Sequence, residues 1–346
     1  MTALADAPYS FAYHAQQRAM VVLSALVQRS VRRFALGERE RLSSAQLTAL
    51  RGRFAALLQR DLENVKAGIY PRSLLFGMPW LDYARRLPRL ALDVPAILAR
   101  MKRGGWRELP PDVDASAYPA YYRRTFHWQT DGYLSRRSAE LYDVGVEFLF
   151  GGTADIMRRQ VIAPIVEVAR SQSRPLQVLD VACGTGRTLA QIHRALPDAR
   201  LTAVDLSPFY LQLARETLGR DPQARFVPTN AESLPFPDNS FDAAVSVFLF
   251  HELPRASRRK VWAEMARVVR PGGRVVVLDS VQRSDAEDLA YFVDRFSREM
   301  HEPFYREYTG DDLAAGMAES GLTIHAVEPA YLAKLVVASP RAAIAP

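Results

Sequence analysis

The segment that decides the fold is Gln177-Val-Leu-Asp-Val-Ala-Cys-Gly-Thr-Gly-Arg-Thr-Leu189. Its apolar run, residues 178–182, predicts a buried parallel strand. The strand ends at Gly184-Thr185-Gly186, and the polar–apolar pattern that follows predicts a helix. A strand, a glycine turn and a helix N-terminus together form a cradle in which a ligand approaches the backbone closely.

Two positions near this turn indicate which ligand the cradle binds. The dinucleotide fingerprint G-x-G-x-x-G/A requires a third small residue, but that position is Leu189 here. Asp180 lies four residues before Gly184, which places a carboxylate at the tip of the strand. A pyrophosphate would be repelled there, whereas a cationic amine would be attracted. The pattern therefore favours S-adenosylmethionine, which carries an ammonium and a sulfonium and no phosphate.

Residues 178–186 resemble motif I of the class I S-adenosylmethionine-dependent methyltransferases, and later motifs of that family follow in order. The similarity covers about residues 140–340 and is closest to the branch that contains the ubiquinone/menaquinone C-methyltransferases. The resemblance implies methyl transfer from S-adenosylmethionine to a small molecule, and we expect an apolar or lipid-like acceptor. The long N-terminal region is absent from the minimal members of that branch, so the quinone substrate is not carried over.

Alternating strand and helix patterns from residue 175 onward predict a doubly wound α/β fold. The last two apolar runs are separated only by Pro329-Ala330, which permits an antiparallel hairpin and forbids a parallel crossover. We therefore expect a mostly parallel seven-stranded sheet with an antiparallel last strand. Strands are expected at 177–182, 200–205, 225–229, 241–248, 274–280, 323–328 and 331–337.

The N-terminal part, residues 1–150, is expected to be a mainly α-helical domain, followed by the cofactor-binding domain at 151–340. Ser43 precedes the second of two helical patterns, and Gly37 separates them. The two apolar stripes are expected to pack on each other as core, with adsorption to a lipid surface as the alternative. The stripe of the first helix consists of Phe11, Ala15, Ala19, Val22, Leu23, Leu26 and Val27.

Charge is distributed unevenly along the 346 residues. Of the net charge of +7, residues 1–150 carry +8 (22 basic minus 14 acidic residues) and residues 151–346 carry −1 (23 minus 24). Such a basic half attracts anionic lipid, an anionic substrate or nucleic acid, or it is a solvated arginine-rich surface. Peripheral membrane contact through the basic helices is therefore left open, and the oligomeric state is not predicted.

Several features bear on compartment. No run reaches the roughly 18–20 apolar residues of a membrane helix. The start Met-Thr-Ala-Leu-Ala-Asp lacks the basic head of a signal peptide. Cys183 is the only cysteine, so no intrachain disulfide forms, and a buried filler is its expected role. These features predict a cytoplasmic protein, with membrane association as an alternative.

An aromatic-rich segment, Tyr121–Tyr133, precedes the boundary between the two parts. It is either a seam that holds the N-terminal helices to the cofactor-binding domain or a lid over the acceptor pocket. His127 within it is expected to be a structural, hydrogen-bonded histidine.

Asp205 ends the second strand, 19 residues after Gly186, where an acidic side chain accepts hydrogen bonds from a ribose diol. The resemblance implies that Asn230 and Ala231 contact the adenine and that Tyr142 approaches the cofactor. A turn asparagine is the alternative reading of Asn230. The predicted cofactor-binding residues are Asp180, Gly184, Gly186, Asp205, Leu206, Asn230, Ala231, Tyr142 and Phe248.

The fourth strand runs into Val247-Phe-Leu-Phe-His251-Glu252, and active sites of open α/β sheets lie at strand C-termini. His251 is the predicted general base, since an imidazole accepts a proton near neutral pH, although a structural hydrogen bond is an equal alternative. Glu252 is interpreted as a carboxylate at a helix start, with a role as a base as the alternative. No metal is predicted, because the six histidines show no ligand spacing.

Two other functions compete with small-molecule methylation. One is a non-catalytic S-adenosylmethionine-binding regulatory module. The other is an RNA methyltransferase that uses the basic helices, although nucleic acid is an unlikely partner. The fourth-strand end, residues 247–251, lacks the Asn/Asp-Pro-Pro-aromatic motif of base N-methyltransferases.

Overall fold

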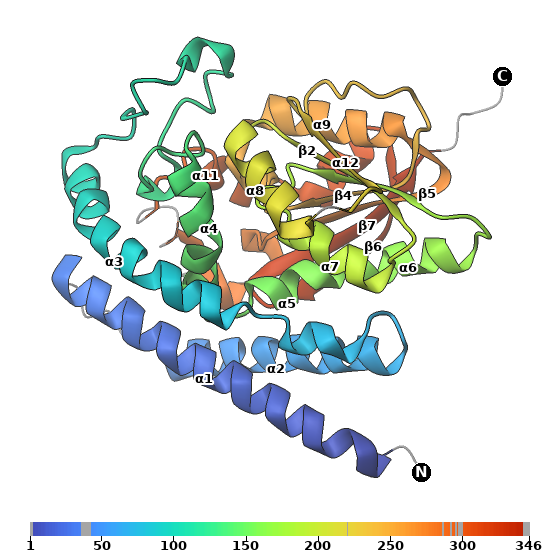
Figure 1. The fold of residues 1–346 in the computed structure, drawn as a ribbon, viewed down its shortest axis with the longest axis horizontal. Helices are drawn as coiled ribbons and strands as arrows, with labels where there is room; N and C mark the ends of the chain where they lie inside the picture. Colours follow the sequence, from blue (N-terminus) through green and yellow to red (C-terminus); the bar gives the residue numbers. More distant parts are fainter. Residues whose placement is uncertain are drawn as a thin grey trace.

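A computed structural model describes residues 3–35, 43–219, 221–285, 287–290, 293–294, 296 and 300–341. Within these residues one seven-stranded sheet forms the centre of the fold (Figure 1). In spatial order its strands are β3 (Ala224–Pro228), β2 (Arg200–Asp205), β1 (Gln177–Val181), β4 (Phe241–Val247), β5 (Val269–Ser280), β7 (Ala333–Pro340) and β6 (Leu322–Ala330). β7 runs antiparallel to both β5 and β6, and the other pairings are parallel. The predicted fold class is confirmed.

The final hairpin lies two residues beyond its predicted position. Pro329 and Ala330 belong to β6, where Ala330 pairs with Ala333, and Tyr331-Leu332 makes the turn. Tyr331 has a φ of 62°, the left-handed conformation that tight two-residue hairpin turns require. Proline is tolerated in β6 because this is an edge strand.

Helices cover both faces of the sheet, as the doubly wound pattern requires. Val178 of β1 packs in the same cluster as Leu189, whereas the next residue, Leu179, packs in the cluster of Trp262 on the opposite face. The strand interior is thus apolar on both sides. The helices of this part are α5 (Ala154–Arg158), α6 (Ile162–Arg170), α7 (Arg187–Ala195), α8 (Pro208–Leu218), α9 (Arg255–Val268), α11 (Tyr305–Thr309) and α12 (Leu313–Glu319).

Four helices of 14 to 33 residues lie in the N-terminal part: α1 (Ala3–Ala35), α2 (Ser44–Lys66), α3 (Trp80–Arg103) and α4 (Arg136–Leu149). Figure 1 shows α1, α2 and α3 gathered on one side of the sheet domain. Ser43, which precedes the second predicted helix, caps α2 in a capping box with Gln46. Short 3-10 helices are η1 (Arg72–Phe76), η2 (Ala115–Ala117), η3 (Phe126–Trp128), η4 (Arg159–Val161), η5 (Phe250–Glu252), η6 (Arg283–Asp285) and η7 (Glu287–Leu289).

A buried ion pair joins the N-terminal helices to the sheet domain. Asp61 of α2 is fully buried and accepts 2.6 Å hydrogen bonds from Arg159 Nε and from the Tyr70 hydroxyl. The Tyr13 hydroxyl of α1 also donates to this carboxylate. Removing one partner of such a pair leaves an uncompensated buried charge, so this cluster holds α1 and α2 in place.

The predicted apolar stripe of α1 is wrong as a description of its buried face. The buried positions are instead Tyr13, Gln17, Met20 and Ser24, which share one helix face. Phe11, Val22 and Leu26 of the predicted stripe are 78%, 59% and 54% exposed. The helix is rotated in this way because the Tyr13 hydroxyl reaches Asp61 and Met20 packs near Phe148. Gly37, the predicted break, lies outside the described residues. None of the described helices combines the length and the apolar content needed to cross a bilayer.

Candidate active site

The predicted cradle forms at the C-terminal end of β1. Ala182, Gly184 and Gly186 have φ values of 58°, 56° and 78°, so the chain turns sharply through left-handed conformations. The Gly184 amide donates to Asp205 Oδ2 at 2.9 Å, which ties the turn to the end of β2. A Cβ at Gly186 would lie 3.0 Å from Ala214, so this glycine lets α7 approach α8.

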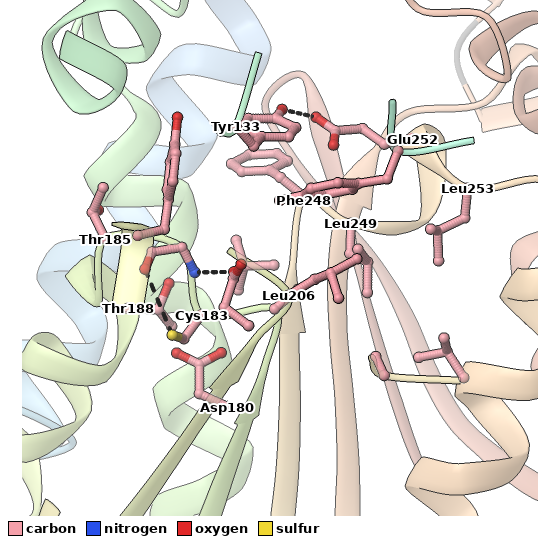
Figure 2. Close-up of a pocket in the computed structure, with 18 of the residues that line it drawn as sticks. Tyr133, Asp180, Cys183, Thr185, Thr188, Leu206, Phe248, Leu249, Glu252 and Leu253 are labelled. Atoms are coloured by element: carbon pink, nitrogen blue, oxygen red, sulfur yellow. Dashed lines mark hydrogen bonds between the residues drawn. The ribbon is translucent and has the colours of Figure 1, made fainter. Parts of the chain in front are cut away.

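A pocket of about 110 Å³ lies over this turn. Its lining includes eight of the nine predicted cofactor-binding residues, and the exception is Gly186, whose neighbour is α8. These eight residues are Asp180, Gly184, Asp205, Leu206, Asn230, Ala231, Tyr142 and Phe248. In Figure 2, Asp180 lies at one end of the pocket and Glu252, with Tyr133 pointing toward it, at the other.

Asp180 is 1% exposed, and its Oδ2 atom has no hydrogen-bond partner among the described residues. Burial, followed by the nearby Asp205 carboxylate, raises the pKa of Asp180 to about 8. A buried carboxylate oxygen without a donor is suited to an incoming cation or N–H donor. The ammonium of a bound amino-acid group supplies both.

Asp205 is held by the backbone. The Gly184 amide donates to its Oδ2 atom, and the Ser207 amide donates to its Oδ1 atom at 2.8 Å. Burial raises the pKa of Asp205 to about 6, although these backbone hydrogen bonds act in the opposite direction. Each carboxylate oxygen keeps a second lone pair, so Asp205 still accepts hydrogen bonds from a diol.

Asn230 stabilises the turn after β3 and also lines the pocket. Its Oδ1 atom accepts a 2.9 Å hydrogen bond from the Glu232 amide, which is the geometry of a turn asparagine. The Tyr121 hydroxyl donates to Glu232 Oε1 at 2.7 Å, so the aromatic segment is anchored at this edge. The predicted contact of Asn230 with adenine stays a prediction.

The aromatic segment forms one wall of the pocket. Tyr121, Tyr122, Phe126 and Tyr133 line it together with Tyr142 of α4. Phe126 and Tyr133 are stacked with ring centroids 5.3 Å apart. The segment therefore joins the N-terminal part to the sheet domain and borders the glycine-turn pocket, whereas a role as a lid over an acceptor stays a prediction.

A second cavity, of about 770 Å³, lies between the N-terminal helices and the end of β4. Tyr142, Phe248 and Glu252 line both cavities and thus form a shared wall. The rest of its lining is mainly apolar and comes largely from α1, α3 and α4, for example Leu26, Leu87, Leu90, Ile97, Leu98 and Phe148. Gly145 of α4 faces open space there, with no atom within 4 Å of a Cβ placed on it.

His251 lines the second cavity and not the first. Its Nδ1 atom lies 2.6 Å from Asp279 Oδ1 at the end of β5, which leaves Nε2 as the other ring nitrogen. Burial lowers the pKa of His251, but the Asp279 carboxylate outweighs it and raises the pKa to about 9. The imidazole is therefore protonated at neutral pH in the cofactor-free protein. Asp279 was overlooked in the sequence, although its place at a strand end signals a functional side chain.

Glu252 does not have the predicted position at a helix start. It ends η5, while α9 begins after Pro254 without a side-chain cap. The Glu252 carboxylate instead accepts a 2.5 Å hydrogen bond from the Tyr133 hydroxyl and lies 3.2 Å from His127 Nε2. Sequence reasoning missed these partners, because they come from segments more than a hundred residues apart.

Two arginines that the sequence did not single out also line the first pocket. Arg158 Nη1 donates to Asp155 Oδ1 at 3.0 Å, and Arg187 also donates to Asp155. The adjacent Asp143 accepts a 2.9 Å hydrogen bond from Thr185 Oγ1 in the glycine turn. These buried charges are mutually compensated, and they fix the turn against α4 and α5.

Comparison with known proteins identifies the surrounding domain. Residues 178–273 match a family model described as a methyltransferase domain. The chain is 37% identical over 147 residues to the ubiquinone/menaquinone biosynthesis C-methyltransferase UbiE of Methylobacterium nodulans, which covers 42% of this chain and 56% of that protein. It is 32% identical over 163 residues to the O-methyltransferase cnsE of Penicillium expansum, which covers 46% of this chain and 56% of the relative.

The chain thus spans little more than half the length of these relatives. Among solved structures, it is similar to an O-methyltransferase family protein from Burkholderia thailandensis. That comparison has 19% identity and a TM-score of 0.43, and it covers 60% of this chain and 63% of the other.

The raised pKa of Asp180 predicts a pH-dependent stability. Folded Asp180, with a pKa of about 8, holds a proton that an unfolded aspartate releases near pH 4, so raising the pH favours unfolding. Between about pH 5 and pH 8, the free energy of unfolding of the wild type should fall by roughly 3 kcal/mol more than that of Asp180→Asn. Urea unfolding of the cofactor-free protein at each pH measures this free energy of unfolding. The exposed Asp198→Asn variant is the control and should follow the wild type; an identical pH dependence in Asp180→Asn would contradict the assignment.

Proposed function

Because the C-terminal half of the chain carries a class I S-adenosylmethionine-dependent methyltransferase domain, we propose that it methylates a small, largely apolar acceptor. The observation that carries this proposal is the wall shared by the two cavities. Tyr142, Phe248 and Glu252 border the glycine-turn pocket on one side and the apolar cavity on the other. A donor in the first pocket and an acceptor in the second would meet at this wall, which is what in-line group transfer requires.

The residues around the first pocket fit the proposed cofactor. The unpaired Oδ2 atom of Asp180 is placed for an ammonium group, and Asp205 at the end of β2 is placed for a ribose diol. Asn230 and Ala231 line the part of the pocket beyond β3, where the adenine would lie. When bound, S-adenosylmethionine supplies an electrophilic methyl group.

The chain's own contribution is alignment, exclusion of water and removal of a proton. Phe248 stacks on Phe150 with ring centroids 5.5 Å apart, so aromatic rings shield the meeting point of the cavities. His251, oriented by Asp279, would accept the acceptor's proton at Nε2. Since Asp279 raises the pKa of His251 to about 9, this role requires loss of the imidazolium proton first.

The lining of the second cavity supports an acceptor class. The lining from α1, α3 and α4 is mainly apolar, and His251, Glu252 and His127 also line the cavity. An acceptor that would fit both kinds of lining has a hydrocarbon body and a head with an ionisable hydroxyl or an acidic carbon. The relatives' names include both a C-methyltransferase and an O-methyltransferase, so they do not choose between these atoms.

Filling the apolar cavity should separate acceptor binding from cofactor binding. Gly145→Phe adds a ring to the open space of the cavity, at a position of α4 where a Cβ meets no atom within 4 Å. It should lower transfer of labelled methyl from S-adenosylmethionine into a cell lipid extract by about tenfold or more. Calorimetric affinity for S-adenosylmethionine should stay unchanged. Asp205→Ala should instead weaken the calorimetric affinity for S-adenosylmethionine.

Two control variants accompany Gly145→Phe and Asp205→Ala. Gly52→Phe adds the same ring to an equally open, exposed position on α2 that does not line the cavity, and it should not change transfer. Gly145→Ala should keep most of the activity. Undiminished transfer by Gly145→Phe would contradict the acceptor assignment. Tight cofactor binding by the wild type without transfer to any extract would instead favour a non-catalytic binding module.

The His251–Asp279 pair predicts the pH profile of transfer. The wild-type kcat/KM should rise with pH toward about 9, because deprotonated His251 is the active form. His251→Gln should lose about 100-fold or more and also lose this rise. Asp279→Asn should move the rise to lower pH, since burial without the carboxylate disfavours the imidazolium. A His251→Gln enzyme with the wild-type rate and profile would exclude His251 as the base.

The outer face of α1 supports a further part of the proposal, peripheral contact with an anionic membrane. Residues 9–29 contain Arg18 and Arg29 and no acidic residue, and both arginines lie on the exposed side with Phe11 and Val22. A helix with an apolar face and flanking arginines adsorbs to anionic bilayers. Leu26 is both exposed and part of the cavity lining, so the cavity borders this face.

Vesicle binding tests this contact. The full chain should sediment with vesicles that contain phosphatidylglycerol and far less with phosphatidylcholine vesicles, and Val22→Glu should reduce the bound fraction severalfold. Val327→Glu is the matched control, because Val327 is an exposed valine of β6. Equal sedimentation of Val22→Glu and wild type would contradict the proposal. The proposal would also be contradicted if the wild type did not bind vesicles and instead formed a concentration-dependent dimer that Val22→Glu abolished.

A further inference from the structure

Three side chains of metal-ligand type meet beside the apolar cavity, and two of them, His127 and Glu252, line it. His127 comes from η3, Glu252 ends η5, and Glu302 precedes α11. One ligand atom from each lies within 4.8 Å of the other two. His127 Nε2 is 3.2 Å from Glu252 Oε1, and His127 Nδ1 is 2.8 Å from Glu302 Oε1. The sequence did not predict this group, because its three residues come from distant segments and show no ligand spacing.

Glu302 is the member whose environment is least satisfied. Its side chain is 0% exposed, and neither of its oxygens has a hydrogen-bond donor within the part of the chain that the structure describes. His127 Nδ1, though only 2.8 Å away, also lacks a hydrogen bond, so the two atoms are close without the direction of an N–H···O bond. Buried carboxylate oxygens without donors indicate a missing partner.

The charge of the group points to a cation. The two glutamates contribute −2, and among the described residues no arginine or lysine forms an ion pair with either. The nearby His251 imidazolium, 4.0 Å from Glu252 Oε1, does not compensate this charge, because it is paired with Asp279. A protonated His127 leaves the three side chains at −1, whereas a divalent ion with a neutral His127 imidazole brings them to zero. An uncompensated charge is costly in a buried site.

We propose that His127, Glu252 and Glu302 bind one divalent metal ion. One nitrogen and two carboxylate ligands suit Mn²⁺, Fe²⁺ or Zn²⁺, and three protein ligands leave positions open for a further ligand. His127 and Glu252 both line the acceptor cavity, so these positions face it. The role of the ion rests on the proposed function: it would coordinate an oxygen of the acceptor's head and lower the pKa of that group.

Metal uptake by the chelator-treated full chain tests the site directly. Titration with MnCl₂, followed by the electron paramagnetic resonance signal of free Mn²⁺, should show one bound ion per chain. Co²⁺ should give the visible absorption of a protein-bound ion. Glu302→Gln and His127→Gln should each weaken binding at least about tenfold. Glu307→Gln is the matched control, since this exposed glutamate pairs with Arg255 on the surface and should leave affinity unchanged.

S-adenosylmethionine affinity, measured on the same preparations, reports whether each variant is folded and keeps the two proposals separable. If the wild type takes up no Mn²⁺, Co²⁺ or Zn²⁺ at millimolar concentration, His127 is an imidazolium bridging two glutamates and the metal site is refuted, whatever the variants do. Wild-type affinity in a folded Glu302→Gln also refutes it. Cofactor binding and methyl transfer by metal-free protein would leave the proposed function standing while removing the ion from it.

Discussion

Buried negative charge is the constraint on which the candidate site depends. Asp180, Asp205 and Glu252 line the two cavities, and Glu302 lies behind His127 of the second one. None of the four forms an ion pair with an arginine or lysine in the described part of the chain. The fold tolerates them through backbone amides at Asp205, the Tyr133 hydroxyl at Glu252 and a raised pKa at Asp180. A cationic ligand relieves this cost, so binding and protonation are coupled at this site.

Elsewhere in the fold, buried carboxylates are compensated by arginines and do not need a ligand. The Asp61–Arg159 pair and the Asp155–Arg158 pair are equally buried, but each carboxylate meets a guanidinium. These compensated pairs hold the N-terminal helices and α5 in fixed positions. Fixed charge pairs thus support the scaffold, while unpaired carboxylates gather where a ligand is expected.

Under the proposed function, the apolar cavity would give the N-terminal helices a role beyond packing. Its lining comes largely from α1, α3 and α4, all outside residues 178–273, which match the methyltransferase family. The residues that match the methyltransferase family and the helices that would select the acceptor under the proposed function therefore lie in different stretches of chain. For this reason the substrates named for the relatives do not define the acceptor of this protein.

The sequence by itself determined the sheet, the glycine turn and the strand-end carboxylates Asp180 and Asp205. These follow from local hydrophobic periodicity and from the rule that parallel strands end at one edge, and neither requires knowledge of distant contacts. Only the tertiary structure decided which face of α1 is buried, because the Tyr13 hydroxyl had to reach Asp61, 48 residues away. It also brought His127 to Glu252 across 125 residues, a contact that no spacing in the sequence encodes. Local physics thus specified the cradle, whereas long-range packing assembled the second cavity, the proposed acceptor site.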